Sequence, residues 1–73
     1  MDETILFNLI STILGVEVGE VQIDSTPDDF HSWDSFKHME LLLALEEKFS
    51  IKFSDEQISS IRSVKDIHSI LFD

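Results

Sequence analysis

Ser35 is the residue best placed to do chemistry in this 73-residue chain, because it follows an acid, Asp34, where a helical pattern begins. The first N–H groups of a helix have no partner inside the helix and lie at the positive end of its dipole. An anion attached to Ser35 would therefore be stabilised by those groups. A simpler interpretation is that Asp34 or Ser35 only caps the helix, and spacing alone favours that interpretation.

Other residues offer less chemistry. His31, His38 and His68 form no i,i+4 pair with a further ligand, so we expect no metal site. We place His38 at the edge of the core and the other two near the surface. Ser35, His38 and Asp34 lie too close in sequence to form a preorganised hydrolytic triad. The chain contains no cysteine, which excludes disulfides, thiolate nucleophiles and Cys-based zinc sites.

The segment 35–49, SFKHMELLLALEEKF, is the strongest helix candidate and presents two apolar stripes. On a wheel of about 100° per residue, one stripe suits a core: it contains His38, Leu42, Leu45 and Phe49, with Leu41 at its edge. The nearly opposite stripe contains Phe36, Glu40, Leu43 and Glu47. An exposed apolar pair flanked by carboxylates is typical of a docking face. Alternatively, Leu43 packs under a loop and the glutamates are merely solvated.

Three further helices are predicted around this one, giving an all-α domain. Periodicity and capping place the four helices at residues 3–14, 35–49, 55–60 and 64–72. Asp2 can cap the first helix, and Gly15 suits the position just after its end. Ser54 and Gln57 form a capping box, and Ser63 is a natural N-cap.

Residues 15–34 interrupt the helical pattern and contain both glycines and the only proline. A strand-like alternation of Val16, Val18, Val21 and Ile23 allows a hairpin turning at residues 19–20. A lone hairpin is marginally stable and no other segment offers it a sheet. We therefore favour a long loop, pinned across the core by those four side chains.

Length and charge limit the classes of function. Seventy-three residues allow one small domain, 1–73, and leave no room for a deep enzyme cleft. The net charge of −10 argues against nucleic acid as a partner and predicts attraction to basic protein surfaces. Because the N-terminus has no signal-peptide pattern and no segment could span a membrane, we expect a cytoplasmic protein. We also expect it to be a monomer.

The residues from Asp34 to Ile51 also resemble the motif of a known protein family. Asp34-Ser35-Phe36, then Glu40-Leu41, then the run from Ala44 to Ile51 (ALEEKFSI), resembles the acyl carrier protein family. The length, the acidity and the order of helices and long loop agree with it. The resemblance extends from about Leu6 to Leu71 and implies the four-helix bundle of acyl carrier proteins.

The resemblance implies a function for each site residue. Ser35 would receive a 4′-phosphopantetheine arm from coenzyme A, transferred by a separate magnesium-dependent phosphopantetheinyl transferase that also uses Asp34. The arm's thiol would hold acyl groups as thioesters for fatty-acid, polyketide or related biosynthesis. The protein would be a shuttle and not an enzyme, serving acyl-transferring, synthase or ligase enzymes with basic docking patches. Its partner-recognition residues would be Phe36, Glu40, Leu43, Glu46 and Glu47.

Several residues depart from the family pattern. Phe36 replaces the usual leucine, Lys37 and Lys48 stand where acids are common, and Trp33 replaces a small residue. Two alternatives also stay open: an aminoacyl or peptidyl carrier, or a carrier-like interaction subunit that is never modified.

Overall fold

The structure, a computed structural model, describes residues 3–72, and this part of the chain contains four α-helices and no strand. The helices are α1 (Glu3–Leu14), α2 (Ser35–Phe49), α3 (Asp55–Ser60) and α4 (Val64–Phe72), with two 3₁₀ turns, η1 (Val18–Glu20) and η2 (Pro27–Asp29). The four predicted helices are confirmed at the predicted residues. The hairpin does not form, since its expected turn lies within η1.

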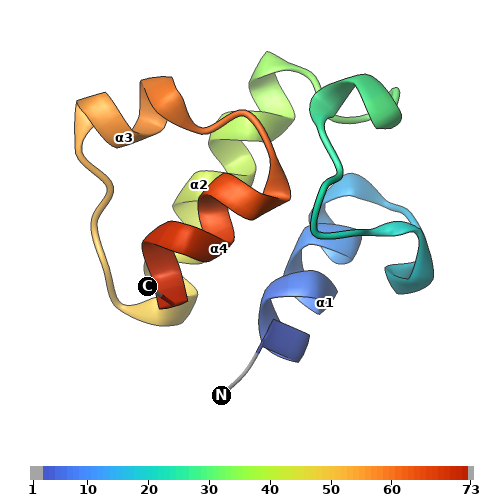
Figure 1. Cartoon of the computed structure of the whole chain (residues 1–73), viewed down its shortest axis with the longest axis horizontal. Coiled ribbons are helices and arrows are strands. Elements are labelled where there is room, and N and C mark those ends of the chain that lie inside the picture. The colour runs from blue at the N-terminus through green and yellow to red at the C-terminus, as the bar shows by residue number, and fades with distance from the viewer. Residues whose placement is uncertain (1–2, 73) are drawn as a thin grey trace.

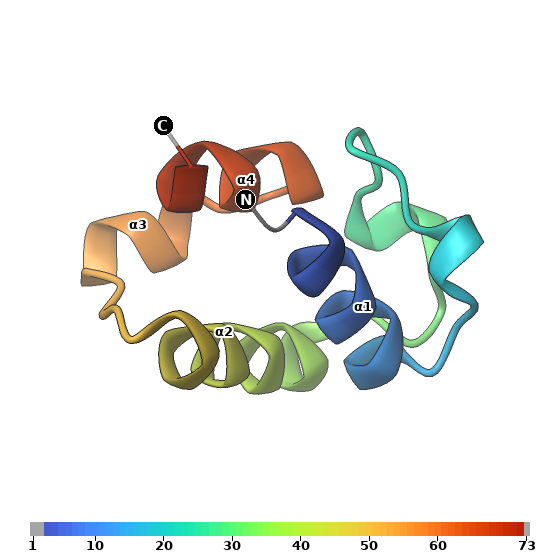
Figure 2. The ribbon, with the colours of Figure 1, turned by 90° about the horizontal axis from the view of Figure 1, so that it is seen from below.

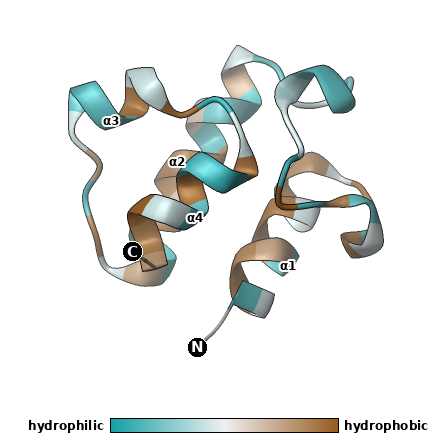
Figure 3. Cartoon of the chain, viewed as in Figure 1, coloured by the Kyte–Doolittle hydropathy of each residue, from teal (hydrophilic) through white to brown (hydrophobic). Residues whose placement is uncertain are grey.

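The helices enclose a single core (Figures 1 and 2). Seen from below in Figure 2, α2 and α4 form opposite sides of the molecule. The short helix α3 lies at one end and the long loop between α1 and α2 lies at the other. Figure 3 shows brown, apolar segments along α1, α2 and α4. The largest fully buried side chains of this core are Leu6, Ile10, Leu41, Leu42, Leu45, Val64 and Ile67.

The long loop is fixed to the core by fewer side chains than the sequence predicts. Val21 is buried, but Val18 is 46% exposed and Ile23 is 43% exposed, so the predicted anchoring by these two is wrong. Trp33 and a backbone hydrogen bond replace them. The N–H of Val64 donates to the carbonyl of Ser25 at 3.0 Å, which joins the loop to the first residue of α4.

The helix ends explain why the boundaries were predictable. Gly15 has φ +71°, the left-handed conformation expected just after α1. The capping box of Ser54 and Gln57 forms, and the Ser63 hydroxyl accepts the N–H of Asp66 at 3.2 Å. The predicted cap Asp2 lies outside the described residues.

Candidate functional site

The start of α2 separates the roles of Asp34 and Ser35. Asp34 is the N-cap: its Oδ1 accepts the N–H of Lys37 at 2.9 Å, and its carbonyl accepts the N–H of His38 at 2.8 Å. Ser35 is the first helical residue and is exposed. Because Asp34 alone caps the helix, the Ser35 hydroxyl is not required for capping and remains accessible to a reagent.

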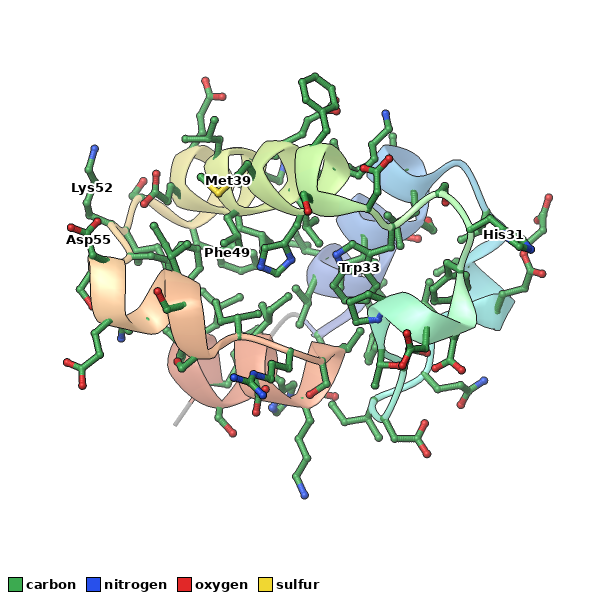
Figure 4. The ribbon with its side chains drawn as sticks, turned by 90° about the horizontal axis from the view of Figure 1, so that it is seen from above. His31, Trp33, Met39, Phe49, Lys52 and Asp55 are labelled. Carbon is green, nitrogen blue, oxygen red and sulfur yellow. The ribbon has the colours of Figure 1, made fainter. Side chains whose placement is uncertain are left out.

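An open cleft of about 780 Å³ lies beside Ser35. Its walls come from the end of the long loop, the first turns of α2 and the connection between α3 and α4. The residues that line it include Thr26, Trp33, Ser35, His38, Met39 and Arg62. In Figure 4, Trp33 lies between the start of α2 and the loop, whereas His31 lies far out on the loop. A flexible group attached to Ser35 would therefore lie next to the walls of this cleft.

Trp33 and His38 form one wall of this cleft. Trp33 is 3% exposed, and its Nε1–H donates to Nδ1 of His38 at 3.1 Å. The planes of the two rings are inclined by 25°, with centroids 6.1 Å apart. Burial lowers the pKa of His38 below its ordinary value of 6.5, so the imidazole is neutral at neutral pH. The prediction that His38 lies at the edge of the core is confirmed, but its bond to Trp33 was not predicted.

The exposed face of α2 contains the predicted apolar pair. Phe36 is 75% exposed and Leu43 is 59% exposed, so the alternative in which Leu43 packs under a loop is wrong. Met39 adds to this face and was missed, although it lies only 60° from Phe36 on the wheel. Glu47 is exposed on the same side.

The other two glutamates of α2 have partners within the chain. Oε1 of Glu40 lies 3.3 Å from Nζ of Lys37, in an ion pair that is partly exposed. Oε2 of Glu46 accepts the backbone N–H of Phe53 at 2.7 Å. This last contact joins the end of α2 to the segment before α3. Glu46, predicted to recognise partners, therefore also makes a structural contact within the chain.

The remaining histidines do not gather with other ligands. His31 is exposed, and His68 is partly buried with its Nε2 2.6 Å from Oε2 of Glu3. Within residues 3–72, no group of three or more His, Asp or Glu side chains is arranged to hold a metal ion. The same residues include no helix long and apolar enough to cross a membrane.

The chain is similar to proteins of a known family. A family model described as a phosphopantetheine attachment site matches residues 4–70. An acyl carrier protein of Helicobacter hepaticus is 43% identical over 54 residues, which cover 74% of this chain and 71% of the relative. Acyl carrier proteins of Clostridium acetobutylicum and Coprothermobacter proteolyticus are 35% and 33% identical, covering 82% and 90% of this chain and 78% and 80% of the relatives.

Proposed function

The chain belongs to the acyl carrier protein family, and we propose that Ser35 Oγ is the atom that carries its 4′-phosphopantetheine arm. One observation carries this assignment: Asp34 caps α2, which leaves the exposed Ser35 hydroxyl free at the helix start and beside an open cleft.

The residues present fit a phosphodiester at this position. The first N–H groups of α2 offer hydrogen-bond donors and the positive end of the helix dipole to a negative charge. Arg62 lines the same cleft and adds a second source of positive potential. The bound group supplies a terminal thiol that holds acyl groups as thioesters, which a chain without cysteine cannot supply itself.

Loading of the site is a phosphoryl transfer in which Ser35 is the nucleophile. Ser35 Oγ forms a bond to the phosphorus that bears the pantetheine of coenzyme A. The bond from that phosphorus to the adenosine 3′,5′-bisphosphate leaving group breaks, and the hydroxyl proton passes to a base of the transferase. This chain is the substrate of that separate magnesium-dependent enzyme, which we expect to contact Asp34, and the chain itself catalyses no step.

Intact mass spectrometry tests the attachment site directly. The protein is incubated with coenzyme A and a broad-specificity phosphopantetheinyl transferase, and we expect a mass gain of one phosphopantetheine. Ser35→Ala should gain nothing, while Ser32→Ala, the nearest other serine in the sequence, should be loaded like the wild type. Loading of Ser35→Ala would refute the site. An unmodified wild type beside a modified known carrier would favour the unmodified interaction subunit.

We further propose that Phe36, Glu40, Leu43 and Glu47 form the docking face for partner enzymes, with Met39 at its edge. An apolar stripe beside acids suits partners with apolar grooves rimmed by basic residues, and such charged contacts favour fast, salt-sensitive association. Glu40→Lys or Glu47→Lys should slow acyl transfer from a partner while thermal unfolding stays unchanged. Asp24→Lys makes the same charge change on the exposed loop and is the control. Equal slowing by all three variants would mean that only net charge matters.

A further inference from the structure

The start of α2 is not held by buried side chains of its own. None of the side chains at residues 35–40 is buried, and the buried residues of the helix begin at Leu41. Helices in proteins owe most of their stability to tertiary packing, and helix ends fray where packing is missing. The first turns of α2 therefore depend on other contacts, and Ser35 is the first residue of these turns.

Trp33 supplies such a contact from the chain just before the helix. Its side chain is 3% exposed and belongs to the core. The indole Nε1–H donates to Nδ1 of His38 at 3.1 Å, and the two ring planes are inclined by 25°. On the loop side, the backbone N–H of Trp33 donates to the carbonyl of Phe30 at 3.2 Å, and the two rings lie with centroids 6.5 Å apart. The indole thus connects the start of α2 to the core and to the long loop.

This contact encloses Ser35. The hydrogen bond joins side chains that are five residues apart, and Ser35 lies between them in the chain. Within the same segment, Asp34 accepts the N–H groups of Lys37 and His38. Burial lowers the pKa of His38, so its imidazole is neutral at neutral pH and Nδ1 can accept the indole N–H. The backbone is therefore restrained on both sides of Ser35, while the Ser35 side chain is exposed.

We propose that the hydrogen bond between Trp33 and His38 positions Ser35 for loading by the transferase. The inference rests on the proposed attachment at Ser35. Phosphoryl transfer requires the nucleophile to be aligned with the reacting phosphorus, and a frayed helix start would present Ser35 Oγ in many orientations. By holding the start of α2, the buried indole reduces those orientations before the transferase binds. Trp33 and His38 are thus positioning residues, and Ser35 remains the nucleophile.

Two substitutions of His38 with similar shapes test this role. Asparagine has nearly the shape of leucine, and its Oδ1 stands where histidine has Nδ1. His38→Asn therefore keeps an acceptor for the indole, and His38→Leu removes it. Leucine is the better helix former, so helix propensity alone predicts the opposite order of effects. His31→Leu makes the same replacement on the exposed part of the loop and is the control.

Two readings are taken, both well below the Tm of each variant. Intact mass gives the rate of loading by a broad-specificity phosphopantetheinyl transferase. Hydrogen exchange of the backbone amides of residues 37 and 38, which donate to Asp34, reports the order of the helix start in the protein without transferase. The second reading separates a loosened helix start from a lost contact between His38 and the transferase.

We expect His38→Leu to be loaded about two- to tenfold more slowly than the wild type, the range that loss of one neutral hydrogen bond gives. The two amides should exchange faster by a similar factor. His38→Asn should stay within about twofold of the wild type in both readings, and His31→Leu should match the wild type. Trp33→Phe removes the donor instead of the acceptor, so adding it to His38→Leu should slow loading no further.

Three results would overturn the positioning role and leave the attachment site in place. They are equal loading of His38→Asn and His38→Leu, additive effects of Trp33→Phe and His38→Leu, and unchanged amide exchange in His38→Leu. If His38→Leu does not fold, Trp33→Phe is compared with the wild type in the same two readings. Loading of Ser35→Ala, or a wild type that is not loaded, would refute the attachment itself and this proposal with it.

Discussion

Replacing Glu46 by alanine should destabilise the protein, whereas the same replacement at the adjacent Glu47 should not. Oε2 of Glu46 accepts the N–H of Phe53 at 2.7 Å, and Phe53 is itself buried. Removal of the carboxylate leaves that backbone donor without its acceptor. Glu47 is exposed and lies on the proposed docking face. The two variants change helix propensity and net charge identically, so their difference isolates the contact to Phe53.

The size of the effect follows from the kind of hydrogen bond that is lost. A bond to a charged group contributes about 1.5–3 kcal/mol, and the partial burial of this one reduces the expectation to about 1–2 kcal/mol. A domain of this size has a total stability of about 4–11 kcal/mol. The corresponding fall in Tm for a domain of this length is about 4–16 °C. Glu47→Ala should remain within about 0.5 kcal/mol of the wild type.

Urea unfolding followed by circular dichroism measures both variants on the same scale, with Tm as a second reading. Transfer of an acyl group from a partner enzyme, measured well below each Tm, adds a functional reading. Glu47→Ala should slow transfer with little loss of stability. Glu46→Ala should lose stability and retain transfer. Equal stability of the two variants would refute the structural role of Glu46.

Three further predictions concern the core, a helix end and pH. Leu42→Ala should cost about 2.7–5 kcal/mol because Leu42 is 1% exposed, while Leu43→Ala on the exposed face should cost about 0.5 kcal/mol or less; urea unfolding checks both. Ser50 has φ 56°, a left-handed conformation that disfavours side chains, so Ser50→Gly should raise stability by up to about 1 kcal/mol, seen as a higher Tm. Burial lowers the pKa of His38 in the folded protein, so the unfolded chain binds a proton at this residue more tightly. The stability that neutral His38 contributes is therefore complete above pH 6.5 and is lost as the pH falls from 6.5 through the pKa of the folded protein. Urea titrations at several pH values should show this loss in the wild type and not in His38→Gln.

The sequence predicted the helices well because their signals are local. The apolar period of α2, the glycine after α1 and the capping serines before α3 and α4 all act within a few residues of the boundaries that they set. The loop was predicted less well. Val18 and Ile23 alternate like residues of a strand, but with no sheet to join, the chain coils into η1 and leaves both side chains exposed. Burial in an irregular segment depends on its path over the core, which periodicity does not describe.

In the site, too, local features were predicted and tertiary contacts were not. The position of Ser35 and the exposure of Phe36 followed from the helix start and the wheel. The contact of Glu46 with Phe53 spans seven residues and depends on how the chain turns after α2, so no helical spacing predicts it. The bond from Trp33 to His38 crosses a helix start at a spacing of five residues, for which a sequence pattern offers no rule. Both contacts are tertiary, and both changed the interpretation of residues that the sequence had already singled out.

The structure around Ser35 reconciles two demands that a carrier faces. The proposed attachment serine must be accessible to enzymes, yet an exposed helix start frays unless its N–H groups are satisfied. Asp34 meets the second demand by capping α2, and the buried indole of Trp33 holds the chain immediately before that cap. Ser35 therefore projects from a fixed backbone while its own side chain remains uncommitted. The rigidity comes from Trp33 and Asp34, which leaves the Ser35 hydroxyl free for the modification that we propose.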